Sequence, residues 1–153
     1  MHYGLALLAG IVAGSRAFTA PAAVSWAARL GYLDLEGTWL AFMGYAWTPW
    51  IFTLLAIVEL VTDQLPSTPS RKVPMQFGAR IVSGALSGAT IGASVGSWVA
   101  GLIAGVIGAV IGTYGGAEIR TRMARAFGRD TPAAFIEDAA AVILGLVIIW
   151  ALR

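Results

Sequence analysis

The chain has 153 residues, of which 58% are hydrophobic and only 12% are charged, and its mean hydropathy is +0.79. A soluble domain of this length needs far more charge to cover its surface. The formal net charge of +2 is too small to indicate nucleic-acid binding. The absence of cysteine excludes a disulfide framework, a thiolate metal site and a cysteine nucleophile.

The apolar residues form long runs. No charged residue occurs from Gly37 to Val58 or from Ile81 to Ala117. About 20 helical residues cross the hydrocarbon core of a bilayer, so the second run has room for two crossings. We therefore predict an all-α fold, a polytopic transmembrane helix bundle that forms a single domain over residues 1–153.

The first apolar segment, residues 3–30, is longer than one crossing needs. It is interrupted by Gly14-Ser15-Arg16 and by Pro21. A single tilted and kinked helix fits this pattern, and so does a broken helix with a half-helix before Arg16.

The second segment begins with residues typical of an interfacial aromatic belt. Thr48 and Pro49 can supply a helix N-cap and a first-turn proline, so this crossing begins either at Trp39 or at Thr48 and ends near Asp63. The aromatic residues are Trp39, Phe42, Tyr45, Trp47, Trp50 and Phe52.

The third segment spans about residues 77–96 and the fourth about residues 98–116, with a tight connection at Ser97-Trp98. Both carry glycine at nearly every fourth position, which allows two helix backbones to approach closely in a membrane. We expect a glycine-zipper contact between them rather than a pore wall. Its glycines are Gly84, Gly88, Gly92, Gly96, Gly101, Gly105, Gly108, Gly112 and Gly116.

The fourth segment continues into EIRTRMARAFG, and Asp130-Thr131-Pro132 is a good start for a last crossing over about residues 132–152. This gives about five crossings, with four crossings plus a re-entrant or broken N-terminal segment as the alternative. Such a chain has too few helices to enclose a large solute path alone, so we expect a homo-oligomer.

Basic residues gather in two loops, residues 64–76 and 118–131, which the positive-inside rule places in the cytoplasm. If the first segment crosses once, the N-terminus is inside and the C-terminus outside. The second loop pairs an apolar strip with a basic flank, a pattern that binds anionic lipid headgroups. The expected contacts are Arg120, Arg122, Arg125 and Arg129.

Charges at membrane depth mark candidate functional residues, because each costs about 2.5–3.5 kcal/mol on insertion scales. Arg16 has two interpretations. It binds an anion or acts as a counter-charge beside a helix break, or it lies near the membrane interface. Glu59 and Asp63 share one helical face at i,i+4 spacing. They form either a cation, proton or metal site, or a salt bridge to Arg16, Arg80 or the basic loop.

Glu137 and Asp138 fall in the second turn of the last helix, where the helix dipole favours acids. Glu118 lies one turn before Arg122, which favours an intrahelical ion pair. Most of the candidates map to the cytoplasmic helix ends, as either a polar vestibule or a structural ring of ion pairs. The candidate transport-path or ion-pair residues are Arg16, Glu59, Asp63, Arg80, Glu137 and Asp138.

Little in the sequence indicates an enzyme. The single histidine, His2, lies at the terminus, and the motifs HExxH, GxSxG and the P-loop do not occur. We predict no catalytic residue, no resident metal and no cofactor.

Four stretches, GSRAFTAPAAVSWAARLG, WTPWIFTLLAIVELVTDQLPSTPS, FGARIVSGALSGATIG and IEDAAAVILG, carry a resemblance to a known family. From about Gly14 to Gly145 the chain resembles the domain-of-unknown-function family four-one-two-six. The resemblance implies a multi-pass protein of the bacterial inner membrane and supplies no activity or site residue.

Two functions follow as hypotheses. The first is a transporter- or channel-like protein for an ion or small solute, with Arg16 and Glu59 lining the path. The second is a non-transporting membrane protein that binds lipid or a partner, with the same charges as structural ion pairs.

Overall fold

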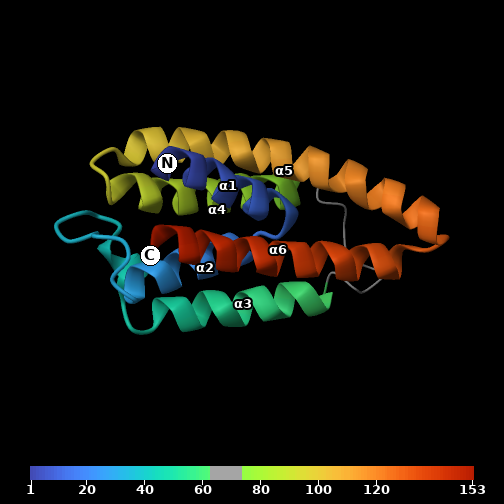
Figure 1. The fold of residues 1–153 in the computed structure, drawn as a ribbon, viewed down its shortest axis with the longest axis horizontal. Helices are drawn as coiled ribbons and strands as arrows, with labels where there is room; N and C mark the ends of the chain where they lie inside the picture. The colour runs from blue at the N-terminus through green and yellow to red at the C-terminus, as the bar shows by residue number, and fades with distance from the viewer. Residues whose placement is uncertain (63–73) are drawn as a thin grey trace.

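The computed structural model describes residues 1–62 and 74–153 (Figure 1). The chain in these ranges forms α-helices, one short 3-10 helix and no strand, so the all-α prediction is confirmed. The helices are α1 (His2–Ser15), α2 (Thr19–Arg29), the 3-10 helix η1 (Ala41–Gly44), α3 (Thr48–Thr62), α4 (Pro74–Ala93), α5 (Trp98–Phe127) and α6 (Asp130–Leu152).

Successive α-helices alternate in direction along the bundle (Figure 1). One end, here called the aromatic end, carries both termini and the tryptophans that begin α5 and finish α6, Trp98 and Trp150. Trp39 packs edge-on against Trp98 there, with ring centroids 5.5 Å apart. The other end, the basic end, carries the turn at Gly128 between α5 and α6, and these two helices project beyond the break between α1 and α2 (Figure 1).

The first apolar segment is a broken helix that folds back on itself, which is the second of the two alternatives that the sequence left open. α1 ends at Ser15, Arg16 has an extended backbone (φ −140°, ψ 113°), and α2 starts at Thr19 and runs back antiparallel to α1. Both termini consequently lie at the same end of the bundle. The placement of the termini on opposite sides depended on a single crossing by the first segment, and this condition is not met.

Two described helices, α5 and α6, are long and apolar enough to cross a membrane. α1 and α3 are apolar but have only 14 and 15 residues. α4 has 20 residues but is not apolar enough to count as a span, because it carries Gln76 and Arg80 besides glycine, serine and threonine. Length and composition therefore support a membrane protein, and a bundle of five spans is not confirmed.

The helix starts follow local capping chemistry. α3 begins at Thr48 rather than at Trp39, with Pro49 in its first turn, where the missing N–H costs nothing. Gly96 adopts φ +92° in the turn after α4, a conformation that strains any residue with a Cβ. Ser97 then caps α5, its side-chain oxygen accepting a hydrogen bond from the Ala100 amide at 3.4 Å.

The contact between α4 and α5 is made backbone to backbone. A Cβ placed on Gly88 would lie 2.8 Å from the Cα of Gly105, and one on Gly92 would lie 2.8 Å from the Cα of Gly101. Real Cβ atoms essentially never come so close, so a residue larger than glycine cannot enter without moving a helix. Gly96, beyond the end of α4, has open space around it.

A second row of glycines on α5 faces α1. A Cβ on Gly108 would lie 2.8 Å from the Ile11 amide nitrogen, and one on Gly112 would lie 2.8 Å from the Ile11 carbonyl carbon. Helices α1, α4 and α5 consequently form the most closely packed part of the bundle. This three-helix contact holds the C-terminal end of α1 in place, and the break follows directly after it.

Helices α2, α3 and α6 form the other side of the bundle. The Trp26 indole N–H of α2 donates to the Thr53 hydroxyl of α3 at 2.8 Å, and Gly145 of α6 lies against Ala23 of α2. α3 is peripheral, since only Pro49 and Ala56 on it are buried. The bundle thus has a dense three-helix side and a looser side, with the break in the first segment between them.

Candidate functional site

The break between α1 and α2 leaves backbone polar groups without helical partners. The last carbonyls of α1 and the first amides of α2 lie in the bundle, where Arg16 is fully buried and Ala17 is 7% exposed. Buried backbone groups are almost always hydrogen-bonded. The buried backbone groups at the break therefore need hydrogen-bond partners from other helices.

The carboxylate of Glu59 binds the backbone amides at the start of α2. Ala17 N–H donates to its Oε1 at 2.7 Å, and Phe18 N–H donates to its Oε2 at 2.9 Å. Glu59 comes from α3 and is separated from these residues by about forty positions in the chain. An anion at a helix N-terminus is favoured both by the free N–H groups and by the helix dipole.

The carbonyls on the other side of the break are bound from α4. Arg80, only 4% exposed, donates from Nη1 to the Gly14 carbonyl at 3.4 Å, and the Ser83 hydroxyl donates to the Ala17 carbonyl. The same Nη1 lies 3.8 Å from Oε1 of Glu59. A cation thus lies at the C-terminus of α1 and an anion at the N-terminus of α2, the signs that the two helix dipoles favour.

The side chain of Arg16 crosses to α6. Its Nε donates to Oδ1 of Asp138 at 2.6 Å, its Nη2 is also paired with that oxygen, and Nη2 lies 3.5 Å from Oε2 of Glu137. Arg16 has no exposed surface, and Glu137 is 8% exposed. A buried charge is tolerated only when it is paired, so these contacts are needed for the fold to close around Arg16.

Arg120 has a position that the sequence pattern did not indicate. It is 19% exposed, its Nη1 lies 3.4 Å from Oε2 of Glu137, and it holds Asp130 through Nε at 3.0 Å and Nη2 at 2.6 Å. Arg16 and Arg120 thus contact the same oxygen of Glu137. Asp130 lies ten positions after Arg120, beyond the turn at Gly128, so no helical spacing rule reveals this pair.

We call the buried charges at the break the charged layer. Five of the six candidate residues from the sequence meet in it, and the sixth, Asp63, lies outside the described residues. The layer consists of Arg16, Glu59, Arg80, Arg120, Glu137 and Asp138.

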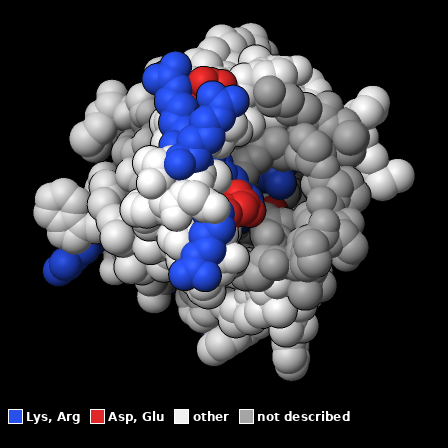
Figure 2. All heavy atoms as spheres, turned by 90° about the vertical axis from the view of Figure 1, so that its right-hand side faces the viewer, with Lys and Arg blue, Asp and Glu red and all other residues white. Residues whose placement is uncertain are grey.

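The remaining arginines of the α5–α6 hairpin face outward. The predicted ion pair between Arg122 and Glu118 is confirmed, with 3.0 Å between Nε and Oε1 on an exposed surface. Arg125 and Arg129 are exposed as well. Figure 2 shows the basic end, where arginine side chains form a band and further charged atoms are visible beside it.

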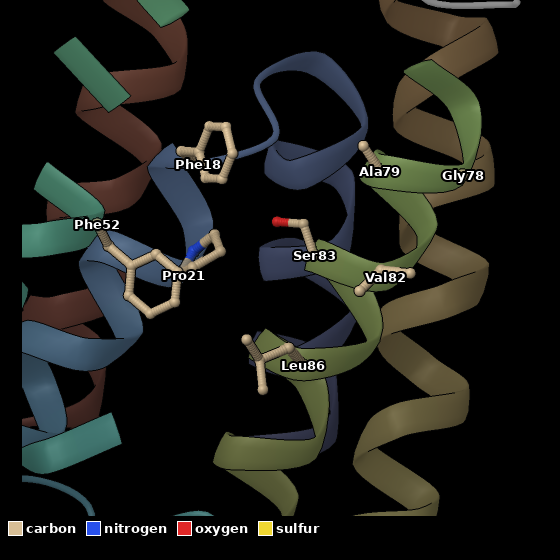
Figure 3. A pocket seen from close by; sticks show the side chains of 8 residues that line it. All are labelled: Phe18, Pro21, Phe52, Gly78, Ala79, Val82, Ser83 and Leu86. Atoms are coloured by element: carbon tan, nitrogen blue, oxygen red, sulfur yellow. The ribbon is translucent and has the colours of Figure 1, made fainter. Parts of the chain in front are cut away.

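An apolar cavity of about 330 Å³ adjoins the break, between α2, α3 and α4 (Figure 3). Phe18 lines it while its amide is bound by Glu59, and Ser83 lines it while its hydroxyl binds the Ala17 carbonyl. The cavity and the charged layer therefore share two residues. The described residues that line it are Phe18, Pro21, Phe52, Gly78, Ala79, Val82, Ser83 and Leu86.

The arrangement favours charge pairing over metal binding. Within residues 1–62 and 74–153, no group of three or more histidine, aspartate or glutamate side chains could hold a metal ion. Each carboxylate of the charged layer instead faces an arginine. Chemically, the site can hold charges of both signs at a helix break and can exchange ion-pair partners there.

Comparison with known proteins adds no assignment: no family model matches the chain, and neither a curated protein nor a solved structure was found to match it.

Proposed function

We propose that this chain is a membrane protein that moves an ion or small solute, and that the charged layer is its gate in the closed state. The observation that carries the proposal is the broken helix. Its free backbone groups are bound by Glu59 on one side and by Arg80 on the other, and an apolar cavity lies directly beside them.

Broken helices have a known use in membrane transport. Many transporters bind substrate or coupling ions where a helix is interrupted, because the half-helix ends supply partial charges. Non-helical backbone at membrane depth is tolerated only where it is buried in protein or lines a cavity. The break at Arg16 meets both conditions, since Arg16 is fully buried and Phe18 lines the cavity.

The charges support the same reading. Ionisable residues within a bilayer are costly and mark transport pathways by default. Here Glu137 is shared by two arginines, so either arginine can leave while the other still compensates the carboxylate. Exchange of partners at Glu137 is a physical route by which the layer opens without leaving a bare buried charge.

The pairing of Arg16 with carboxylates also favours a second candidate function, that of a non-transporting membrane protein. Arg16 has no exposed surface, and its guanidinium contacts two carboxylates of α6. A buried ion pair of this kind can serve only to fix one packing of the helices. In this candidate the charged layer joins the two sides of the bundle and never opens.

The finer features of the bundle belong to the proposal. We infer that the glycine rows of α4 and α5 act as a glycine zipper, which the short backbone distances at Gly88 and Gly92 support. We place the basic end on the cytoplasmic side of a bacterial inner membrane. We propose that Arg122, Arg125 and Arg129 contact anionic lipid headgroups there. A homo-oligomer would supply the additional helices that a large solute path requires.

Flux measurements test the two candidates. The protein is reconstituted into liposomes, and the fluxes of K⁺, Na⁺, Cl⁻, H⁺ and an uncharged solute are recorded. We expect flux of at least one species, and we expect Arg120→Gln to raise it, because this change removes one cation from Glu137 at the mouth of the layer. Arg122→Gln is the matched control, because Arg122 pairs only on the exposed surface in the contacts described above.

If folded wild-type protein and the Arg120→Gln variant are both inert across the panel, the transport proposal is wrong and the structural candidate stands.

A further inference from the structure

The cavity beside the break opens toward the outer surface of the bundle. Helices α3 and α4 lie on either side of it and barely touch along their described lengths. Val82 lines the cavity and is 67% exposed, so the wall of the cavity continues into the outer face of α4. In Figure 3 Phe18, Pro21 and Phe52 face the α4 side chains across this gap.

The lining of the cavity selects for hydrocarbon. Among the described residues that line it, the only polar side chain is that of Ser83, and the hydroxyl proton of Ser83 is already donated to the Ala17 carbonyl. An ion or a sugar placed there would lose its water without gaining hydrogen bonds, which costs several kcal/mol. An apolar group instead gains free energy by leaving water, at roughly 25 cal/mol per Å².

The size of the cavity limits the occupant. A volume of about 330 Å³ lies near the lower end of the range of small-molecule sites, roughly 300–1,000 Å³. This space suits a single chain or ring and is too small for both chains of a phospholipid. The exposed part of the lining is apolar as well, with Val82 67% exposed, so the approach to the cavity is from the bilayer.

We propose that the cavity binds the hydrocarbon part of a single-chain amphiphile, which enters between α3 and α4. This inference rests on the proposed function, because it takes the bundle to be embedded in a bilayer, and it names a ligand that acts on the proposed gate. An occupant touches Phe18, whose amide is bound by Glu59, and Ser83, whose hydroxyl binds the Ala17 carbonyl at the break. Binding therefore acts on the residues that close the gate.

Photolabelling tests the site. The full chain in nanodiscs is exposed to a medium-chain fatty acid with a terminal diazirine, and separately to a phosphatidylcholine with a diazirine in one chain. Labelled residues are mapped by mass spectrometry. We expect the fatty acid to label Phe18, Val82 or Leu86, and we expect saturating unlabelled fatty acid to suppress the labelling.

Gly78→Leu fills the cavity at a position where an added Cβ meets nothing within 4 Å. We expect it to reduce labelling of the cavity by roughly tenfold while the helical content and the monodispersity of the protein are unchanged. Gly115→Leu is the matched control, because Gly115 is an exposed helical glycine with equally open surroundings on α5, away from the cavity.

The outcomes separate this inference from the proposed function. If Gly78→Leu abolishes labelling of the cavity and the protein is inert in flux assays, the binding site is supported and the transport proposal is wrong. Flux that Gly78→Leu leaves unchanged, together with labelling only on outer faces, overturns the binding site and leaves transport standing. Cavity labelling by the phosphatidylcholine alone overturns the choice of a single-chain amphiphile.

Discussion

The backbone amide of Phe18 donates a hydrogen bond to Oε2 of Glu59 at 2.9 Å, and this contact joins α3 to the start of α2. It places a carboxylate where the helix dipole and a free N–H group both favour negative charge. The chain reverses at this point, so the same contact stabilises the turn that makes α1 and α2 antiparallel. Removal of the carboxylate should therefore affect the fold of the N-terminal segment.

Glu59→Leu should destabilise the protein. The amides of Ala17 and Phe18 would lose their acceptor in a buried setting, at about 1–3 kcal/mol for each amide. Glu59→Gln retains one acceptor oxygen and should cost less than Glu59→Leu. The midpoint of thermal unfolding in detergent, followed by helical circular dichroism, measures both changes.

Glu118→Gln provides the control for this series. Glu118 pairs with Arg122 where both side chains are more than half exposed, and exposed pairs contribute only about 0–1 kcal/mol. A Glu59→Leu midpoint as close to wild type as that of Glu118→Gln would show that the carboxylate does not hold the break.

Local chemistry was enough to predict several elements from the sequence. The all-α class follows from long apolar runs, and Thr48-Pro49 and Asp130-Thr131-Pro132 mark the starts of α3 and α6 within two residues. The Glu118–Arg122 pair follows from i,i+4 spacing. Each of these features depends on residues close together in the chain, which is why the pattern reveals it.

The reversal at Arg16 depends on contacts between distant residues, and the pattern could not settle it. Gly14-Ser15-Arg16 indicated an interruption, but a kink and a break fitted equally. The break is specified by Asp138, 122 positions away, and by Glu59 and Arg80 from two other helices. Arg120 was grouped with the lipid-facing arginines because its neighbours in sequence are basic, whereas its partners come from α6.

The pair formed by Arg16 and Asp138 should show strong energetic coupling. Arg16→Met or Asp138→Leu alone leaves a buried charge with fewer partners, whereas the double variant removes both charges. We expect the double variant to be less destabilised than the sum of the two single variants, by about 1–3 kcal/mol. A double-mutant cycle on the free energy of unfolding in detergent measures this coupling, and additive effects would mean that the pair is not formed.

The close contact between α4 and α5 predicts opposite effects for two glycine-to-alanine changes. Gly88→Ala puts a methyl group against the backbone of α5 and should cost about 1–3 kcal/mol or prevent folding. Gly115→Ala has open space and lies in a helix, so it should stabilise the protein by about 0.4–1 kcal/mol. Thermal unfolding compares them, and equal midpoints would contradict the backbone contact.

The alternating helices predict that the two termini lie on one side of a membrane and the α5–α6 turn on the other. The sequence contains no cysteine, so single cysteines at His2, Arg129 and Arg153 can be labelled one at a time without background. A membrane-impermeant maleimide applied to intact spheroplasts should react at positions 2 and 153 but not at 129. In inverted vesicles the pattern should reverse.

This experiment also decides between the two accounts of the first segment. A single crossing by residues 3–30 would place His2 on the same side as Gly128, because α3, α4 and α5 then fix the side of the turn. The folded-back pair α1 and α2 places His2 on the side of Arg153 instead. Labelling of positions 2 and 129 from the same side would therefore refute the reversal at Arg16, and with it the gate that we derive from that reversal.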